Sequence, residues 1–340
     1  MTERKCMACG AILQTEDKDG QGYVRSLDHH ICQSCFRLRH YRDFKRVKAD
    51  VDSAETAQFI EGFDGHIFWI VDIMHLNQSL HSGLIRALHN KDVVLVVNKR
   101  DLLPRSVSDN KLKQSIMRLL KEYNISIMEV IFVSAKKYAT LEPLMPYLDD
   151  APVAFVGCIN AGKSSLLNTL LKDDQLSVSP VSSTTAGIIH IENESFDVYD
   201  TPGFIQESNL VNKFTDENLL MLAPTKGIKP MVIQIYEKQA IMIGNLGYIV
   251  VDPVKTINLV SYLPFKVKRV KPERAEVNLG LEHEFMIKDT EYRKRTWPTQ
   301  MDRVDLEVFD VGFITIQGKL KSLETVMDTS AEVILRKAII

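Results

Sequence analysis

The chain has 340 residues, of which 45% are apolar and 25% are charged. This composition indicates folded globular domains and excludes an intrinsically disordered protein, and the length suits two or three domains. No apolar run approaches the roughly 18 residues that a membrane-spanning helix needs, and the N-terminus lacks the apolar segment of a signal peptide. We therefore expect a soluble, cytoplasmic protein with no membrane partner.

Charge is distributed unevenly along the chain, although the formal net charge is only −2. Residues 1–47 carry nine Lys and Arg against six Asp and Glu, and residues 223–340 carry eighteen against fifteen. The middle of the chain must therefore be acidic. Mildly basic flanks around an acidic centre suit contact with nucleic acid through the flanks, but an excess of three charges on each flank does not decide the question.

Four of the five cysteines lie in the first 47 residues, as two Cys-x-x-Cys pairs with 22 residues between them: Cys6, Cys9, Cys32 and Cys35. Each pair can present two thiolates from one turn, and zinc prefers four such ligands in a tetrahedron. Disulfides are disfavoured in the cytosol, and no βαβ pattern surrounds either pair to suggest redox chemistry. We predict a small zinc module with a structural metal, because all four ligands come from protein. His29 and His30 lie nearby, but four cysteines make them unnecessary as ligands.

A basic segment follows the second cysteine pair. Residues 36–48 carry six Lys and Arg, one Asp and three interleaved aromatic residues. Cations and aromatic rings are what an RNA-facing surface needs, for phosphate contacts and for base stacking. The alternative is a basic linker whose aromatic side chains pack on the zinc module.

Residues 48–152 alternate between helical and strand patterns, which favours an α/β fold. We expect helices over residues 54–63, 80–90, 111–123 and 141–148. We expect strands over residues 66–72, 93–97 and 127–133.

Two of these strands end in polar motifs that suit a guanine base. The first ends in the N-K-x-D motif Asn98, Lys99 and Asp101. A carboxylate at Asp101 can accept hydrogen bonds from both guanine N1–H and N2–H, which adenine does not offer. The next strand ends in Ser134, Ala135 and Lys136, and the N–H of Ala135 could bind guanine O6. Each short motif alone is weak evidence, because polar loops commonly follow strands.

Residues 153–168 match the phosphate-binding pattern G-x-x-x-x-G-K-[ST], between an apolar strand and a helical pattern. Gly157 and Gly162 let the backbone wrap around phosphate, where a Cβ would intrude. Backbone N–H groups and the helix N-terminus then face the anion. Lys163 would bridge the β- and γ-phosphates, and Ser164 would ligate Mg²⁺. The remaining nucleotide contacts expected from this loop come from Asn160, Ala161 and Ser165.

A further strand after this loop ends in Asp-Thr-Pro-Gly, at Asp200 and Gly203. Asp200 would hold Mg²⁺ through water, and the N–H of Gly203 would sense the γ-phosphate. Four such motifs, each at the C-terminal end of a predicted strand, fit the rule that ligands of open α/β sheets bind at those strand ends.

The order of the motifs is unusual. Ordinary GTPases run from the phosphate loop to D-T-x-G, N-K-x-D and S-A-K, whereas N-K-R-D and S-A-K come first here. In this order, and in its four-cysteine N-terminus, the chain resembles the circularly permuted GTPases of the YqeH family, which are bacterial GTPases linked to assembly of the small ribosomal subunit. The motifs cover about residues 60–210, and the resemblance implies GTP and GDP as ligands.

The resemblance also implies a switch threonine that closes on Mg²⁺ when the γ-phosphate is present. Residues 182–187 read Ser-Ser-Thr-Thr-Ala-Gly, and alignment with the P-G-T-T pattern of related GTPases favours Thr185, with Thr184 as the alternative. This sequence has Ser-Ser where those have Pro-Gly, so a Ser/Thr-rich loop without a ligand role stays open.

Ras-type enzymes orient the attacking water with a Gln directly after the D-x-x-G glycine, but here that residue is Phe204. We therefore expect slow intrinsic turnover. Asn160 stands where related K⁺-stimulated GTPases have an asparagine that helps to bind K⁺, and a cation there could take the electrostatic role of an arginine finger. The alternative is that Asn160 only tolerates the loop conformation. The residues expected to act in hydrolysis are Lys163, Asn160, Thr185 and Gly203.

Residues 223–340 carry short apolar and alternating runs, which predict a mostly β domain with helical pieces near residues 278–287 and at the C-terminus. Residues 266–271 and 293–295, the latter followed by Trp297, are basic clusters that could hold RNA phosphates or form ordinary solvated strand edges. No nucleophile and base stand together here, so we assign this domain to binding.

We therefore predict three domains: a zinc-binding module over residues 1–47, a circularly permuted P-loop GTPase domain with an α/β fold over 48–222, and an RNA- or ribosome-binding domain over 223–340. The predicted function is GTP hydrolysis in small-subunit assembly, with the nucleotide state controlling contact with the ribosome or 16S rRNA. The alternative is a GTP-dependent switch or scaffold that recruits a protein partner and hydrolyses little. The oligomeric state stays open.

Overall fold

The computed structural model describes residues 12–16, 23–24, 53–170, 177–180, 187–192, 197–204 and 209–340. The four predicted zinc ligands, the basic segment 36–48 and both candidate switch threonines lie outside these ranges, so those predictions stay untested. Within the described ranges, no helix combines the length and the apolar character needed to cross a membrane.

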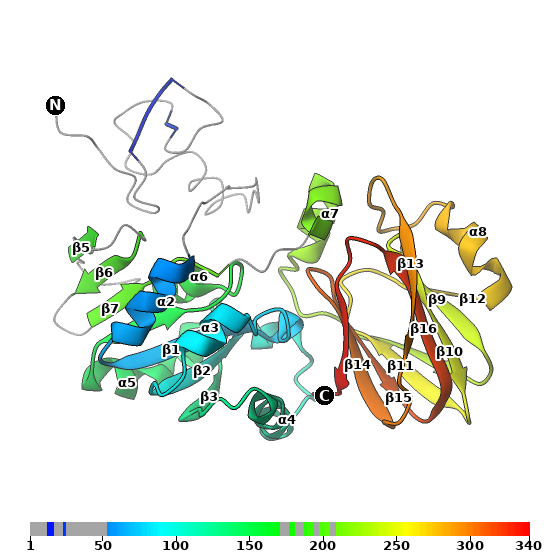
Figure 1. Ribbon diagram of the computed structural model, residues 1–340, viewed down its shortest axis with the longest axis horizontal. Helices are drawn as coiled ribbons and strands as arrows, with labels where there is room; N and C mark the ends of the chain where they lie inside the picture. Colours follow the sequence, from blue (N-terminus) through cyan, green and yellow to red (C-terminus); the bar gives the residue numbers. More distant parts are fainter. Residues whose placement is uncertain are drawn as a thin grey trace.

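Seven strands form the central sheet of the first folded unit: β1 (His66–Asp72), β2 (Val93–Asn98), β3 (Glu129–Phe132), β4 (Val153–Val156), β5 (Ser177–Pro180), β6 (Ile189–Glu192) and β7 (Asp197–Asp200). Their spatial order is β3-β2-β1-β4-β7-β6-β5 (Figure 1). The first five strands in that order pair in parallel, and β6 and β5 continue the sheet antiparallel. β1 and β2 are buried along their whole length, as expected for parallel strands covered on both faces.

The helices of this unit are α2 (Ser53–Gly62), α3 (Ser82–Ala87), α4 (Asp109–Glu122), α5 (Met145–Asp150) and α6 (Lys163–Leu170). Helix α7 (Asp216–Leu222) follows them along the chain, and its residues Met221 and Leu222 pack against the core of the C-terminal strands. Short 3-10 turns lie at η1 (Ile73–His75), η2 (Arg100–Leu102), η3 (Tyr138–Thr140), η4 (Glu142–Leu144) and η5 (Asn209–Lys213). Helices α2, α3 and α4 share one core with Ile67 and Trp69 of β1, whereas α5 and α6 share another with Phe68 and Ile70. This alternation along one strand gives the three-layer α/β/α arrangement.

The strand order explains how the permuted motifs meet. The strand that leads into the phosphate-binding loop, β4, lies between β1 and β7. The strands of the N-K-R-D and S-A-K motifs, β2 and β3, lie beyond β1 on one side, and the strand of the D-T-P-G motif lies on the other. N-K-R-D, S-A-K, the phosphate loop and D-T-P-G therefore follow β2, β3, β4 and β7 at the same edge of one parallel sheet. The prediction of a circularly permuted P-loop fold is confirmed.

The second unit is a sandwich of two antiparallel sheets. Its elements are β8 (Met231–Ile235), β9 (Gln239–Ile243), β10 (Gly247–Pro253), β11 (Ile257–Ser261), β12 (Lys268–Val270), η6 (Pro272–Arg274), α8 (Ala275–Leu279), β13 (Tyr292–Trp297), β14 (Arg303–Val308), β15 (Gly312–Gln317), β16 (Leu320–Asp328) and β17 (Val333–Lys337). One sheet has the order β12-β9-β10-β16-β13 and the other β17-β14-β15-β11-β8. The predicted, mostly β character of this region is confirmed.

Two expectations for the second unit were wrong in detail. The C-terminus forms β17 rather than a helix, because its apolar run pairs with β14. Helix α8 ends at Leu279, so most of residues 278–287 is not helical. A short apolar run does not distinguish a strand from a helix by itself, and here the neighbouring strand decides.

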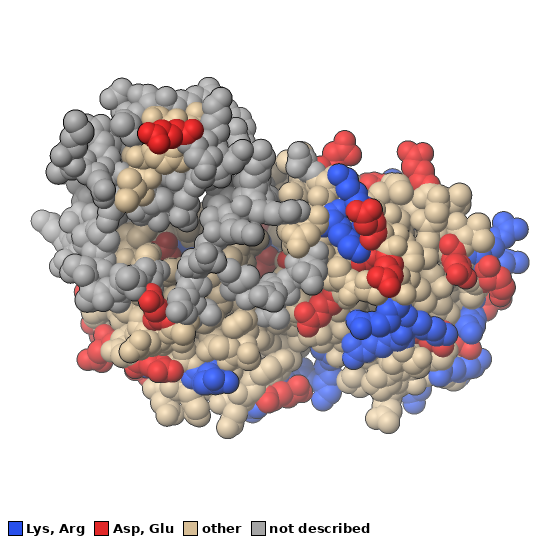
Figure 2. Space-filling model, turned by 45° about the horizontal axis from the view of Figure 1, so that its top comes forward, with Lys and Arg blue, Asp and Glu red and all other residues tan. Residues whose placement is uncertain are grey.

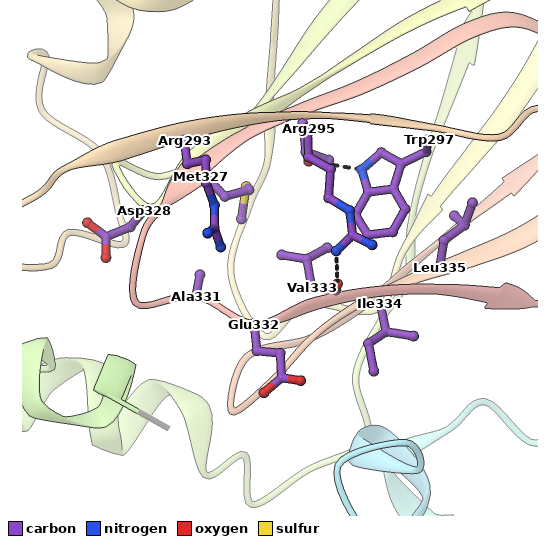
Figure 3. A pocket seen from close by; sticks show the side chains of 11 residues that line it. Arg293, Arg295, Trp297, Met327, Asp328, Ala331, Glu332, Val333, Ile334 and Leu335 are labelled. Carbon is purple, nitrogen blue, oxygen red and sulfur yellow. Dashed lines mark hydrogen bonds between the residues drawn. The ribbon is translucent and has the colours of Figure 1, made fainter. Parts of the chain in front are cut away.

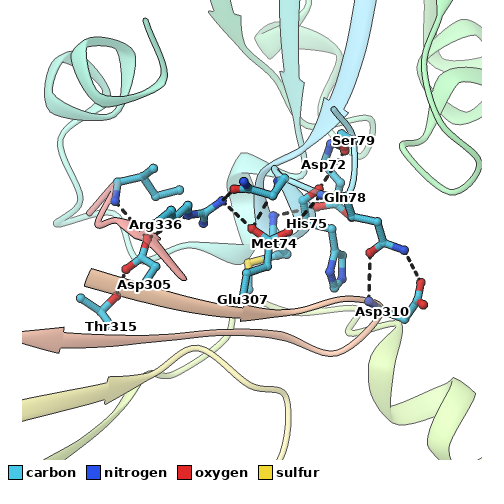
Figure 4. A network of polar contacts seen from close by, with 12 residues as sticks. Asp72, Met74, His75, Gln78, Ser79, Asp305, Glu307, Asp310, Thr315 and Arg336 are labelled. Carbon is cyan, nitrogen blue, oxygen red and sulfur yellow. Dashed lines mark hydrogen bonds and ion pairs between the residues drawn. The ribbon is translucent and has the colours of Figure 1, made fainter. Parts of the chain in front are cut away.

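The sandwich docks on the loop between β1 and α3, residues 73–81, which we call the β1–α3 segment (Figure 4). The backbone N–H groups of Asn77 and Gln78 each donate to the Glu307 carboxylate over 3.2 Å. The Gln78 side-chain amide and Asp310 exchange two hydrogen bonds, of 2.6 and 2.9 Å. Arg336 contacts both Asn77 and Glu307. The two units are thus joined by buried and partly buried hydrogen bonds, most of them to a carboxylate.

Arg336 also supports the sandwich from within. It lies 3.4 Å from the carboxylate of Asp305, and both Asp305 and Glu307 are fully buried. Burial raises the pKa of Asp305, while Arg336 and the hydroxyl of Thr315 act in the opposite direction. Two buried carboxylates therefore depend on one guanidinium.

We expect Arg336→Ala to lower the free energy of unfolding by about 3–5 kcal/mol, because it leaves two buried carboxylates without their cation. Urea unfolding of the full chain measures this change. Lys337→Ala is the matched control, since Lys337 is the next residue of β17 and is exposed. Equal unfolding free energies for the two variants would contradict the structural role of Arg336.

Candidate nucleotide-binding site

The phosphate-binding loop connects β4 to α6 over residues 157–162. Gly157 and Gly162 have φ angles of +153° and +96°, in the region that favours glycine. A Cβ at Gly157 would lie 2.3 Å from the carbonyl oxygen of Ile70, and one at Gly162 would lie 2.3 Å from the side-chain nitrogen of Asn98. The sequence analysis assigned these glycines to phosphate approach, but their closest contacts are with β1 and β2. Packing of the loop against the sheet therefore requires both glycines.

Lys163 lies buried at the start of α6. Its Nζ donates to the carbonyl oxygens of Gly157 and Cys158, at 2.9 and 3.1 Å. Burial lowers the pKa of Lys163, and the charge of Asp200 acts in the opposite direction. The ammonium group is thus held across the loop by backbone carbonyls, where an anion in the loop would also meet it.

Asp200, at the end of β7, has a buried carboxylate oxygen, Oδ1, with no hydrogen-bond partner among the residues that the structure describes. Burial raises the pKa of Asp200 to about 6, and Lys163 partly opposes this shift. A buried, unpartnered carboxylate oxygen fits a metal ligand, since hard cations such as Mg²⁺ bind one or two carboxylates together with substrate phosphates. Ser164 is exposed at the N-terminus of α6, so its hydroxyl is open to a ligand. These residues fit a magnesium-bound nucleotide.

Asn98 ties three loops together. Its side-chain nitrogen donates to the carbonyl oxygen of Ala161 over 2.9 Å, and its oxygen accepts from the N–H of Ala135 over 3.2 Å. The same oxygen accepts from the N–H of Lys99 over 2.7 Å. Asn98 therefore joins the N-K-R-D, S-A-K and phosphate loops, and a guanine O6 at Ala135 would share that N–H with it.

Asp101 is the residue whose carboxylate is predicted to accept hydrogen bonds from the guanine base. Its carboxylate accepts from the Ser134 hydroxyl at 2.7 Å and from Lys136 Nζ at 3.0 Å. Burial favours the neutral acid, but these hydrogen bonds and the charge of Lys136 outweigh burial and lower the pKa of Asp101. The carboxylate therefore stays ionised as a hydrogen-bond acceptor at neutral pH.

Sequence analysis missed Asp72, which ends β1 beside these loops. Its carboxylate pairs with Lys99 Nζ at 2.6 Å and accepts from the N–H of Met74 at 2.9 Å. Lys99 adopts a left-handed conformation, with φ of +61°. A carboxylate at the end of a strand, directly after the apolar residues 67–71, was the sequence signal that could have identified it.

Phe204, directly after Gly203, is buried, with 2% of its surface exposed. Its backbone pairs with the phosphate loop: Phe204 N–H donates to Gly157, and Ile159 N–H donates to Phe204, over 3.1 and 3.0 Å. A Cβ at Gly203 would lie 2.9 Å from Lys163 Nζ, so this backbone passes close to the ammonium group. The side chain in the position of the Ras glutamine is therefore packed in the core and cannot hold a water.

The β1–α3 segment lies on the other side of Phe204. The His81 ring is 5.4 Å from the Phe204 ring, and the Cys158 thiol donates to the carbonyl oxygens of Gln78 and Ser79. Burial raises the pKa of Cys158 to about 11, so it remains a protonated thiol. The segment that binds the C-terminal sandwich therefore also touches the phosphate loop, which sequence reasoning did not detect.

The remaining predicted site residues are accounted for as follows. Asn160 is exposed, with φ of +65°, a left-handed conformation that asparagine tolerates better than most residues. Ser165 is exposed in the first turn of α6, and Ala161 is buried. Among the residues that the structure covers, no group of three or more His, Cys, Asp or Glu could hold a metal ion, and the zinc cysteines fall outside that part of the chain.

Comparison with known proteins finds GTPases among the similar sequences. A family model described as RsgA GTPase matches residues 74–210. YqeH of Bacillus subtilis, described as uncharacterized, is 28% identical over 98% of this chain and 99% of its own length. The small ribosomal subunit biogenesis GTPase RsgA of Chromohalobacter salexigens is 34% identical over 32% of this chain and 33% of its own length.

Among solved structures, YjeQ from Thermotoga maritima matches 42% of this chain and 49% of its own, with 26% identity and a TM-score of 0.29. A TM-score this low has no weight for the fold. The resemblance to YqeH-type circularly permuted GTPases is nevertheless confirmed by the family model and the B. subtilis relative, and the protein is a GTPase.

We expect Asp200→Asn to stabilise the metal-free and nucleotide-free protein at neutral pH. The folded-state pKa of about 6 lies above the ordinary Asp value of 3.8, so the wild type loses stability as the pH rises from about 4 to 6. The difference should reach about 3 kcal/mol at pH 7 and vanish near pH 4. Urea unfolding of both proteins in EDTA at these two pH values measures it. An equal difference at both pH values would contradict a buried, unpartnered carboxylate.

Proposed function

We propose that this GTPase acts in assembly of the small ribosomal subunit, and that its nucleotide state controls its contact with 16S rRNA. The observation that carries the proposal is the meeting of four nucleotide motifs at one sheet edge, in permuted order, next to the docking surface of a β sandwich. The RsgA relative is described as a small ribosomal subunit biogenesis GTPase, which supports the same partner here.

Guanine selection rests on Asp101 in this proposal. An ionised carboxylate accepts from guanine N1–H and N2–H together, while Ser134 and Lys136 hold it in position. Asn98 supports the loop from behind, through its bonds to Ala161 and Ala135. Lys99 is fixed by its pair with Asp72.

The phosphates and the magnesium ion occupy the phosphate loop. Lys163 leaves the loop carbonyls to contact the β- and γ-phosphates, and Gly203 offers its N–H to the γ-phosphate. Ser164, Thr185 and Asp200 are the residues that would hold the magnesium ion. Bound magnesium supplies charge neutralisation of the transferring phosphoryl group.

Hydrolysis is slow in this proposal, because Phe204 stands in the position of the Ras glutamine and is packed in the core. Asn160 stands exposed in the loop and contributes to a K⁺ site that stabilises the developing charge. The same buried Phe204 also favours the second candidate function, a GTP-dependent switch or scaffold that recruits a protein partner and hydrolyses little.

Nucleotide state reaches the C-terminal sandwich by two routes. Along the chain, the switch at Gly203 leads through η5 and α7 to the linker at residues 223–228. Through space, Lys136 Nζ donates to the Thr225 carbonyl over 3.0 Å, and the Ile228 N–H donates to Leu102 over 2.8 Å. The linker therefore rests on the guanine loops themselves, which supports control of the sandwich by the nucleotide.

RNA contact comes from the flanks. Lys and Arg side chains gather on the C-terminal sandwich in Figure 2, and the basic residues of the 266–271 cluster are exposed. The zinc module on Cys6, Cys9, Cys32 and Cys35, with the basic segment 36–48, supplies the second RNA-facing surface.

The experiment that tests the function is GTP turnover in KCl against NaCl, with and without purified small ribosomal subunits. We expect K⁺ to raise the rate by about tenfold or more, since one electrostatic contact to the transition state has at least that effect, and we expect the particles to raise it further. Asn160→Ala should remove the K⁺ effect, whereas Asn168→Ala, an exposed asparagine in α6, should retain it. Tight GTP binding with no response to particles would favour the scaffold function.

We expect Asp101→Asn to weaken GDP binding at least about a hundredfold, because two hydrogen bonds to a charged acceptor are lost, each with about 1.5–3 kcal/mol. Affinity for xanthosine diphosphate should rise relative to GDP, because an amide can donate to its 2-oxo group. Titration with fluorescent nucleotides measures both. Asp252→Asn is the matched control, since Asp252 pairs with Lys321 in the sandwich, away from the guanine loops. Unchanged GDP affinity in Asp101→Asn would rule out Asp101 as the residue that binds guanine.

A further inference from the structure

The C-terminal sandwich has a groove where its two sheets diverge, between the edge strands β13 and β17 (Figure 3). Its volume is about 260 Å³. The walls are built from Arg293, Arg295 and Trp297 of β13, Thr325 and Met327 of β16, and residues 331–335 leading through β17. This groove plays no part in the nucleotide chemistry described above.

The composition of β13 is unusual for a strand that faces a core. Side chains alternate between the two faces of a strand, and Trp297 belongs to the core between the sheets. Arg293 and Arg295 share that face with Trp297, and in the register they stand opposite Met327 and Thr325. The side chains that β13 directs toward the open end of the sandwich are therefore two arginines, Arg293 and Arg295, rather than apolar residues.

Arg295 forms a flat platform in the groove. Its guanidinium lies 3.8 Å above the Trp297 ring, and one nitrogen donates to the Val333 carbonyl over 3.4 Å. The indole N–H donates to the Thr325 hydroxyl over 2.9 Å, which fixes the ring beneath it. One face of the planar guanidinium is covered by the indole, and Arg295 is exposed, so the opposite face is available for stacking.

Arg293 supplies a free cation beside this platform. The residue is exposed, and its side chain has no hydrogen bond or ion pair with any residue that the structure describes. The neighbouring carboxylate of Asp328 is already paired with Lys213 at 2.8 Å and accepts from the N–H of Glu291 at 2.9 Å. The Arg293 guanidinium is therefore available to an anion.

We propose that this groove binds one nucleotide of a single-stranded RNA, with the base stacked on Arg295 and a backbone phosphate paired with Arg293. The inference rests on the proposed function, because it identifies one contact through which the sandwich would hold RNA. Arginine planes stack on unpaired bases, and guanidinium groups bind phosphate with two parallel hydrogen bonds. Glu332, exposed at the rim, accepts from an amino group of the base.

The size and the closure of the groove favour a base over a peptide. Its volume lies below the roughly 300–1,000 Å³ of pockets for drug-sized ligands, so it suits a single ring system. An extended peptide would add to the free edge of β13 or β17, but the hydrogen bond from Arg295 to Val333 spans the gap between these strands. A peptide strand would have to break that bond to enter.

The test is fluorescence anisotropy of the full chain, in Mg²⁺ and GDP, with fluorescein-labelled 12-nucleotide oligoadenylate and oligouridylate RNA. We expect Arg293→Ala and Arg295→Ala each to weaken binding at least about tenfold, as expected for loss of a stacked base or a phosphate pair. Arg295→Lys, which retains the charge but not the plane, should lose nearly as much as Arg295→Ala. Thermal melting of each variant checks that it is folded.

The matched control is Lys294→Ala. Lys294 is exposed on the opposite face of the same strand and pairs with Glu324, so its removal changes the net charge equally and leaves the groove intact. We expect a change below about twofold. An equal loss in Lys294→Ala and Arg293→Ala would overturn the proposal in favour of general charge attraction, and unchanged binding by Arg295→Lys would overturn the stacking.

Two further outcomes separate this inference from the proposed function. If small subunits stimulate turnover but the oligonucleotides do not bind, the inference fails and the function stands, and the inward arginines only protect the sheet edges from pairing. If the oligonucleotides bind as described but small subunits have no effect on turnover, the groove stands and the ribosomal function fails. Competition by an unlabelled acidic peptide would assign the groove to protein and overturn the inference.

Discussion

The buried amide of Asn98 holds the nucleotide site together. Its two polar atoms bond to Ala161 in the phosphate loop and to Ala135 in the S-A-K loop, and its own residue begins the N-K-R-D loop. Asn98 has only 1% of its surface exposed, so each of these bonds forms away from water, where an unpaired polar group would be costly. These bonds fix the positions of the N-K-R-D, S-A-K and phosphate loops relative to one another.

This arrangement explains why the permuted order is compatible with the site. The amide acts through space, and the parallel strands β3, β2, β1, β4 and β7 bring the loops together regardless of which one comes first. What the permutation changes is the path of the chain around the site. The D-T-P-G loop now lies near the end of the α/β unit, and the chain continues from it toward the sandwich instead of returning into the sheet.

The sequence predicted the parts of the site that are local. Asp101, Lys163 and Asp200 each belong to a short motif at or just after the C-terminal end of a strand, and such a motif can be recognised without knowledge of the fold. Asn77 and Gln78 were missed because their meaning depends on Glu307, which lies about 230 residues later along the chain.

The strands β13 and β14 are difficult to recognise in the sequence for a related reason. Charged residues at Arg293 and Arg295, and buried acids at Asp305 and Glu307, break the apolar alternation by which strands are recognised. The apolar alternation therefore fails at two kinds of position. Asp305 and Glu307 pair with Arg336, and Glu307 also binds the β1–α3 segment, whereas Arg293 and Arg295 line an open groove. Neither surrounding can be seen in the sequence.

The sandwich is held on both sides of the nucleotide site. On the guanine side, Lys136 contacts Asp101 and the linker carbonyl of Thr225 at once. On the phosphate side, the β1–α3 segment contacts Cys158 and, through His81, Phe204, while its other surface bonds to Glu307 and Asp310. The chain that leaves Phe204 is a third attachment, because Leu210 of η5 and Met221 and Leu222 of α7 pack in the sandwich core. The sandwich is therefore tied to the guanine loops, to the phosphate loop and to the segment that follows D-T-P-G.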